Sequence, residues 1–171
     1  MTTDITTTYF KTTSFEEAAA GIDNGDRNLV DLGRAKYRNY EDYYNVGAAN
    51  WLMSLITDDY AGSLNIELQT DLSATEIPLG EYPFSTSLEA GTAVIGELKK
   101  ITYGDSSIYI STGSYWQLYN LSTSHVEELA YLKSGVITIG KNGNDYTINL
   151  NALDGHGNTI TMSYTGPLEQ E

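Results

Sequence analysis

Residues 136–164 read VITIGKNGNDYTINLNALDGHGNTITMSY, and their pattern indicates the fold class. Apolar residues occupy every second position over 146–150 and again over 160–164, with polar residues between them. A period of two places successive side chains on opposite faces of a β-strand. Asn142-Gly143 favours a tight hairpin turn, and residues 154–158 supply a second turn signal. This stretch therefore predicts three consecutive antiparallel strands.

The same period of two recurs along most of the chain, and nothing in the spacing suggests a β-α-β unit. About nine or ten strands in local order predict an all-β fold, an antiparallel meander that closes as a barrel. A β-sandwich is the alternative. Pro83 cannot donate to a ladder, so its strand is expected at a sheet edge. Besides the three strands above, the expected strands are 33–38, 51–55, 64–69, 80–84, 91–102, 107–112 and 115–121.

Two short helices are expected from capping boxes, in which a Ser side chain and a Glu three residues later cap each other's amides. The first runs from Ser14 to Gly21, and the second from Ser124 to Gly135. Residues 1–13 are rich in threonine and unpatterned, so they are predicted to be a mobile N-terminal segment. The chain from 14–171 is predicted to be a single all-β domain.

The core is expected to consist of the apolar members of the alternating runs, because those side chains share one face of each strand. We predict that the following residues are buried: Trp51, Leu64, Ile66, Leu68, Ile148, Leu150, Ile160 and Met162.

Composition excludes several classes of function. The formal net charge of −14 repels the phosphate backbone, so a nucleic-acid partner is not expected. The simplest interpretation of this acidity is solubility. The chain has no cysteine and only two histidines, which argues against a zinc site, and we expect neither metal nor cofactor. No apolar run reaches the length of a membrane span.

No catalytic motif appears in the chain. A Gly-x-Ser-x-Gly elbow is absent, and His125 and His156 lie apart, at a predicted helix start and a hairpin tip. Among 23 acidic residues some pair will lie at a hydrolytic distance by chance, and Glu67, Glu81 and Glu97 are ordinary candidates. We therefore expect that the protein is not an enzyme.

Aromatic residues are the remaining candidates for a binding site, since the chain has fourteen tyrosines. Tyr43 and Tyr44 stand beside the predicted turn at 45–47, and Trp116 follows Tyr115 on one strand. Exposed rings near turns suit stacking on a sugar or anchoring a protein partner. We predict that Tyr43, Tyr44 and Trp116 bind the ligand.

Three segments carry a resemblance to a known group of proteins. They are residues 35–51, with Ala35-Lys36-Tyr37 and Ala49-Asn50-Trp51 at their ends, residues 79–84, and the C-terminal run 143–168. Together they resemble uncharacterised secreted or lipid-anchored β proteins of gut Bacteroidetes. The resemblance implies an extracytoplasmic or cell-surface location, although the anchor cysteine typical of that group is missing from this chain.

These observations predict a non-catalytic extracytoplasmic binding module, for a glycan or another surface ligand. One alternative is a structural or adhesion component that binds a surface protein, for example through an edge strand at 80–86. A second alternative is a carrier that encloses a small ligand in the lumen of its barrel. A hydrolase built on scattered carboxylates is a third.

Overall fold

The structure is a computed structural model, and it describes residues 14–171. The predicted mobile segment 1–13 lies outside the described residues. The helix is α1 (Phe15–Ala19), and the strands are β1 (Arg27–Leu29), β2 (Leu32–Asn39), β3 (Ala48–Thr57), β4 (Gly62–Asp71), β5 (Gly80–Ser85), β6 (Thr92–Val94), β7 (Glu97–Tyr103), β8 (Ser106–Thr112), β9 (Tyr115–Asn120), β10 (His125–Asn142), β11 (Asp145–Asp154), β12 (Thr159–Gly166) and β13 (Glu169–Gln170).

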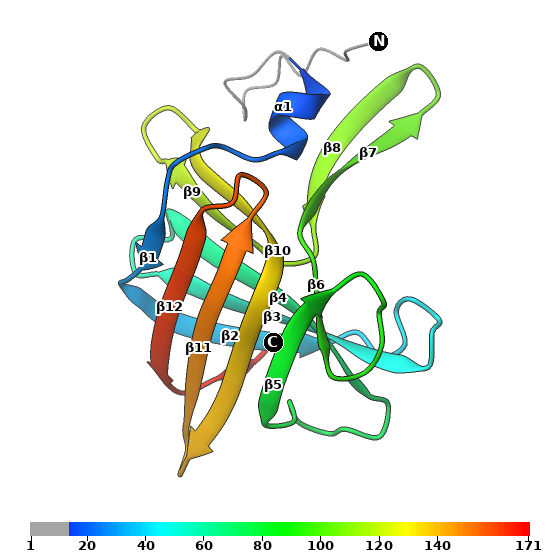
Figure 1. Cartoon of the computed structure of the whole chain (residues 1–171), viewed down its shortest axis with the longest axis vertical. Helices are drawn as coiled ribbons and strands as arrows, with labels where there is room; N and C mark the ends of the chain where they lie inside the picture. The colour runs from blue at the N-terminus through cyan, green and yellow to red at the C-terminus, as the bar shows by residue number, and fades with distance from the viewer. Residues whose placement is uncertain (1–13) are drawn as a thin grey trace.

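The fold is all-β and contains a closed barrel of five strands. The barrel runs β4, β6, β5, β10 and β9, with β9 returning to β4. From β4 the sheet continues through β3 and β2 to β13, and from β10 it continues through β11 and β12 to β1. Figure 1 shows β12, β11, β10 and β5 side by side, with β2, β3 and β4 behind them. Barrel closure and the three-strand run β10–β11–β12 are confirmed, but five strands close the barrel, whereas about nine or ten were expected to do so.

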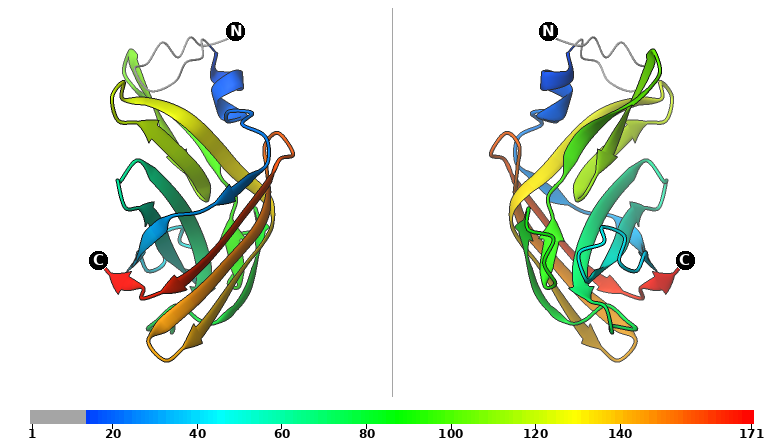
Figure 2. Two further views of the ribbon diagram at one scale, coloured as in Figure 1. Left: turned by 90° about the vertical axis from the view of Figure 1, so that its left-hand side faces the viewer. Right: turned by 90° about the vertical axis from the view of Figure 1, so that its right-hand side faces the viewer.

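Strand β10 joins the two halves of this sheet and occupies the place of the second predicted helix. Its first part pairs with β9 and its later part with β5 and β11, and it curves between them (Figure 2). The helix predicted over 124–135 is therefore wrong. A β-bulge between Val126 and Glu128 interrupts the alternation, so Val126, Leu129 and Ala130 are all buried at a spacing that resembles a helical one.

The sheet also departs from a pure antiparallel meander. Three short pairings are parallel, namely β1 with β12, β5 with β6, and β13 with β2. Pro83 does not place β5 at a free edge, because residues 80–83 pair with β10 and residues 84–85 pair with β6. The strand that was expected to offer an open edge thus completes the barrel.

The core between the two halves of the sheet is filled by side chains from the alternating strands. All eight predicted core residues are buried, with exposed fractions between 0% and 3%. Around them pack further residues such as Met53, Leu55 and Ile137, which are also fully buried. Alternation therefore identified the inward face of each of these strands correctly.

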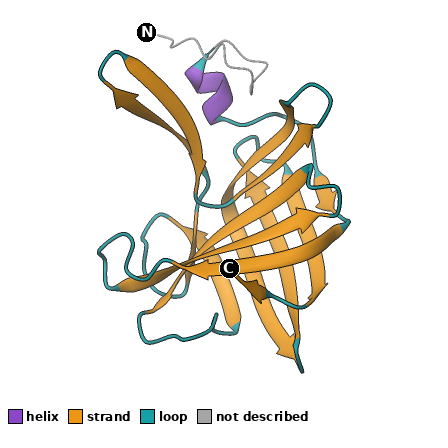
Figure 3. Ribbon diagram, turned by 180° about the vertical axis from the view of Figure 1, so that it is seen from behind, coloured by secondary structure: helices purple, strands orange, loops and turns teal. Residues whose placement is uncertain are grey.

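A hairpin formed by β7 and β8 projects from the barrel beside α1 (Figures 1 and 3). Helix α1 is five residues long, begins after Ser14 as its N-cap, and packs the Phe15 ring 5.8 Å from the ring of Tyr109 on β8. Among residues 14–171, the first of the two expected helices is present as α1, and a strand takes the place of the second. No helix in this part of the chain is long and apolar enough to cross a membrane.

Candidate functional site

A pocket of about 290 Å³ lies on the face of β3 and β4 that points away from the core. The loop between β2 and β3 forms one wall, and the segment that joins β8 to β9 forms the other. We call residues 40–47 the tyrosine loop and residues 111–115 the inner wall. The lining residues are Tyr40, Tyr43, Tyr44, Asn50, Leu52, Asn65, Glu67, Ser111, Thr112, Gly113 and Tyr115.

The floor of the pocket follows from strand alternation. In β4, Leu64 and Ile66 are fully buried in the core, so Asn65 and Glu67 project from the opposite face. In the antiparallel register with β3, Glu67 lies opposite Leu52. One apolar and two polar side chains from neighbouring strands therefore meet on the floor.

Glu67 is the most buried charged group of the pocket, with 9% of its surface exposed. Its Oε1 accepts hydrogen bonds from the Tyr44 hydroxyl and, at 2.8 Å, from Asn50 Nδ2. Its Oε2 accepts from the backbone N–H of Gly113 at 3.1 Å. Three donors from three separate segments thus fix the orientation of this carboxylate.

Tyr44 holds its proton firmly at this site. Burial raises the pKa of the Tyr44 hydroxyl well above its usual range, and the hydrogen bond to Glu67 and the negative charge of that carboxylate raise it further. The hydroxyl therefore remains a donor to Glu67 throughout the physiological range of pH.

The tyrosine loop keeps its shape through its own hydrogen bonds. The Asp42 carboxylate accepts from the backbone N–H of Val46 at 2.8 Å and of Gly47 at 3.0 Å. Asn39 Oδ1 accepts from the N–H of Glu41 at 2.8 Å. The Asn39 contact is that of an Asx turn, and together these short-range contacts hold the loop beside the pocket.

The three rings of the loop are arranged edge to face. The Tyr43 and Tyr44 rings are 5.0 Å apart at an angle of 86°, and those of Tyr40 and Tyr43 are 6.2 Å apart at 68°. Tyr43 is 67% exposed, whereas Tyr44 is half-buried. The loop therefore offers both an open ring face and a ring that is anchored on the floor.

The inner wall is built into the barrel. Gly113 has a φ of +71°, and a Cβ at this position would lie 1.9 Å from the carbonyl oxygen of Ile95. The Oγ of Ser114 accepts a hydrogen bond from the backbone N–H of Glu67 at 3.0 Å. The backbone carbonyl of Ser114 accepts one from the backbone N–H of Leu132 at 3.0 Å. Only glycine fits this close approach of two backbones, which presents the Gly113 N–H to Glu67.

Two of the three predicted site residues, Tyr43 and Tyr44, line the pocket together, but Trp116 does not. Trp116 is only 4% exposed, so the expectation that its ring is exposed is wrong. The consecutive rings do point to opposite faces, as β-geometry requires. Tyr115 faces the pocket, and Trp116 packs in the core.

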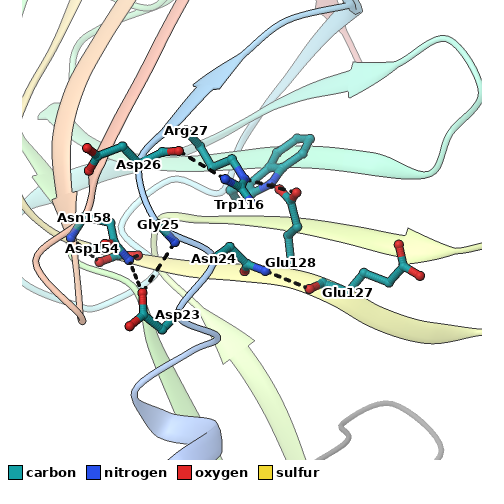
Figure 4. A network of polar contacts seen from close by, with 10 residues as sticks. All are labelled: Asp23, Asn24, Gly25, Asp26, Arg27, Trp116, Glu127, Glu128, Asp154 and Asn158. Atoms are coloured by element: carbon teal, nitrogen blue, oxygen red, sulfur yellow. Dashed lines mark hydrogen bonds and ion pairs between the residues drawn. The ribbon is translucent and has the colours of Figure 1, made fainter.

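The Trp116 side chain instead anchors the segment that leads into β1, and Figure 4 shows it beside Arg27 and Glu128. Its Nε1 donates to Glu128 Oε2 at 2.9 Å, and Arg27 Nε donates to Glu128 Oε1 at 3.1 Å. Close by, Asp23 accepts from the N–H of Gly25 at 3.4 Å (Figure 4). This network fastens residues 23–27 across β9 and β10. The buried tryptophan also borders a second cleft beside β1.

The other candidate residues are dispersed. Glu81 lies on β5 and is exposed, outside the pocket lining, and Glu97 lies on β7 opposite Thr112 of the inner wall. His156 is at the β11–β12 turn with its Nε2 3.2 Å from a backbone carbonyl, and His125 begins β10 as a half-buried residue. The structure brings neither histidine to the pocket.

Sequence reasoning missed most of the floor and the whole inner wall. Asn50 and Asn65 belong to alternating strands, and their outward position could have been read from the buried neighbours. Gly113 and Ser114 read as an ordinary turn. Their role depends on contacts with Glu67, 46 and 47 residues away in the chain, for which a local pattern contains no signal.

Comparison with known proteins found no matching family model, no similar curated protein and no similar solved structure.

Proposed function

We propose that the protein is a non-catalytic binding module that holds a sugar unit of a glycan in the pocket between the tyrosine loop and the inner wall. The observation that carries this proposal is the combination of an open tyrosine ring with an oriented carboxylate. Tyr43 is 67% exposed at the rim, and Glu67 is fixed on the floor by three donors.

This combination matches the chemistry of a sugar ring. The C–H face of a pyranose is apolar and packs on an aromatic ring, while its hydroxyl groups need fixed donors and acceptors. Tyr43 supplies the ring, and Asn50, Asn65 and Glu67 supply amide and carboxylate groups on the floor. A volume of about 290 Å³ suits one or two sugar units at the lower end of the range for small-ligand sites.

The arrangement favours binding over hydrolysis. Glycosidases of the usual kind place two carboxyl groups on either side of the scissile bond, as acid and as base or nucleophile. Glu67 is the one carboxylate among the residues that line this pocket, and donors already occupy both of its oxygens. Glu67 therefore suits the role of a fixed acceptor.

A location outside the cytoplasm or at the cell surface belongs to the same proposal. The resemblance to secreted and lipid-anchored β proteins of gut Bacteroidetes supports this location. The abundance of glycans at cell surfaces supports it as well. The carrier alternative receives less support, because the interior of the barrel is filled by side chains such as Ile66, Leu68 and Ile137.

A glycan array followed by isothermal titration calorimetry tests the proposal. We expect binding to at least one glycan on the array, and a loss of affinity of at least ten-fold in Tyr43→Ala. The matched control is Tyr103→Ala, which removes a ring of similar exposure (64%) from β7, outside the pocket lining. Absence of binding to every glycan, or equal affinity in Tyr43→Ala, would refute the proposal. Release of reducing sugar from a bound glycan would refute its non-catalytic part.

One observation favours protein adhesion as a second candidate function. On one face of the projecting hairpin, Ile108 is 48% exposed and Ile110 is 38% exposed. Tyr103 lies on the same face of the hairpin. Exposed aliphatic side chains on one face suit a protein partner. If adhesion is the function, Ile108→Lys with Ile110→Lys should abolish attachment of protein-coated beads to host cells, and Tyr43→Ala should leave that attachment intact.

A further inference from the structure

The carboxylate of Glu67 has no cationic partner in the described part of the chain. The four ion pairs found within residues 14–171 all use other acidic side chains. No lysine, arginine or histidine lines the pocket. A carboxylate that is 9% exposed has lost much of its hydration, and neutral hydrogen bonds replace only part of it. The pocket thus contains a negative charge that the protein leaves uncompensated.

Two cationic side chains, Arg38 and Lys133, make other contacts. The Arg38 guanidinium lies over the Tyr40 ring, 5.2 Å from its centre. The Lys133 ammonium donates to the Gly96 carbonyl and lies 5.7 Å from the Tyr131 ring. Neither side chain lines the pocket.

A second carboxylate adds to the negative potential. Glu97 stands opposite Thr112 of the inner wall, and its charge contributes to the raised pKa of Tyr44. Its own ion pair, with Lys99 at 3.2 Å, is solvent-exposed and therefore weak. The Glu97 carboxylate lies outside the lining but next to the inner wall, so it strengthens the negative potential that attracts a cation.

Glu67 also retains hydrogen-bonding capacity. A carboxylate offers about four acceptor positions, and the three donors described above use three of them. The exposed ring of Tyr43 adds a negative π-face at the rim, which attracts an ammonium group. Both features favour a ligand that brings a positively charged N–H donor.

We infer that this pocket selects an amino sugar, whose ammonium group pairs with Glu67 while its ring packs on the tyrosine loop. The inference rests on the proposed glycan-binding function and specifies its ligand class. A neutral sugar would satisfy the remaining acceptor but would leave the charge uncompensated.

Calorimetry with two matched ligands tests the inference on the unmodified protein. The glucosamine trisaccharide and the N-acetylglucosamine trisaccharide share a backbone and differ in whether each unit carries an ammonium group. We expect the glucosamine trisaccharide to bind at least ten-fold more tightly at low salt, and this preference to shrink in 0.5 M NaCl. Trilysine, which brings ammonium groups without a sugar, is expected to bind at least ten-fold more weakly than the glucosamine trisaccharide.

The variant Glu67→Gln should reduce the preference for the glucosamine trisaccharide to less than three-fold. Glu81→Gln is the matched control, because it removes the same charge from an exposed position outside the pocket lining. Equal or tighter binding of the N-acetylated ligand would overturn the amino-sugar inference and leave glycan binding intact. Equal binding of trilysine would show that charge alone is recognised and would also overturn it. If neither trisaccharide binds but other glycans on the array do, only the amino-sugar inference fails. If no glycan on the array binds, the proposed glycan-binding function fails as well.

Discussion

The two walls of the pocket are built in opposite ways. The tyrosine loop is held by short-range hydrogen bonds of Asp42 and Asn39 and exposes the rings of Tyr40 and Tyr43. The inner wall is held by contacts that cross the barrel, and Gly113 and Ser114 are buried there. The first wall offers side chains to a ligand, and the second offers a backbone N–H to Glu67.

Because of this difference, substitutions in the two walls should have different effects. Substitutions in the tyrosine loop should change what the pocket binds and leave the barrel intact, because few barrel contacts depend on the loop. Substitutions in the inner wall should disturb the fold first, because its backbone is packed against two other segments.

The largest effect is expected for Gly113→Ala. A Cβ at this position would meet the Ile95 carbonyl at 1.9 Å and a positive φ disfavours alanine, so unfolding free energy should fall by about 2–5 kcal/mol. Gly47→Ala in the tyrosine loop is the control. It has a similar φ of +80° but open space around it, so it should cost about 1–2 kcal/mol. Urea denaturation measures both, and equal losses would contradict the proposed difference between the walls.

A smaller loss of stability is expected at alkaline pH. Burial raises the pKa of Tyr131, whose hydroxyl lies 2.8 Å from Ser111 Oγ of the inner wall, to about 12, and burial raises that of Tyr82 to about 12 as well. Because these values exceed the unfolded value of about 10, the stabilisation is complete below pH 10 and is lost as pH rises through 12.

Together the two tyrosines should remove about 2–3 kcal/mol of unfolding free energy between pH 9 and pH 11, because each loses a little over 1 kcal/mol in this range. Urea denaturation at a series of pH values measures this change. Tyr131→Phe should flatten part of the dependence, since it removes one of the two titrating groups. A midpoint that stays constant up to pH 11.5 would show that these hydroxyls are not protected.

Asp42→Ala should cost about 1 kcal/mol of unfolding free energy, because two backbone N–H groups lose a carboxylate acceptor in a partly exposed loop. Its effect on glycan affinity should be larger in proportion, since the loop no longer holds its rings in place. Asp42→Asn retains an acceptor oxygen, so its stability and glycan affinity should lie between those of the wild type and those of Asp42→Ala. Wild-type affinity in Asp42→Ala would indicate that the loop does not need this anchor.

The smallest effect on stability is expected for Tyr43→Ala, within about 0.5 kcal/mol of the wild type, because the ring is largely exposed. The same variant should lose glycan affinity at least ten-fold. Urea denaturation measures the stability and calorimetry measures the affinity, and together they should show that Tyr43 contributes to binding and little to stability. A stability loss above about 1.5 kcal/mol would instead make Tyr43 part of the structural framework.

Sequence patterns predicted the features that depend on neighbouring residues. Alternation identified the strands and the core, and turn proximity pointed to Tyr43 and Tyr44. Alternation also required Tyr115 and Trp116 to face opposite ways, but it did not say which ring faces the core. The structure places the larger ring inside, where Gly62 on β4 makes room for it.

The features that escaped prediction depend on long-range contacts. The bulge in β10 gave a buried strand the spacing of an amphipathic helix, and pairing with β9 overrode that local signal. Glu67 was one of three carboxylates of equal standing. Its distinction comes from Tyr44, Asn50 and Gly113, which surround it only in the folded chain.

If a glycan binds between the two walls, above Glu67, the backbone amides around the pocket should respond to it. The most direct measurement is a ¹⁵N–¹H correlation spectrum titrated with the glycan that gives the strongest array signal. We expect the largest shifts at the amides of Tyr43, Tyr44, Glu67 and Gly113, and no change at the tip of the β7–β8 hairpin around Gly104. Shifts centred on that hairpin or on the cleft beside β1, with the pocket amides unmoved, would contradict it.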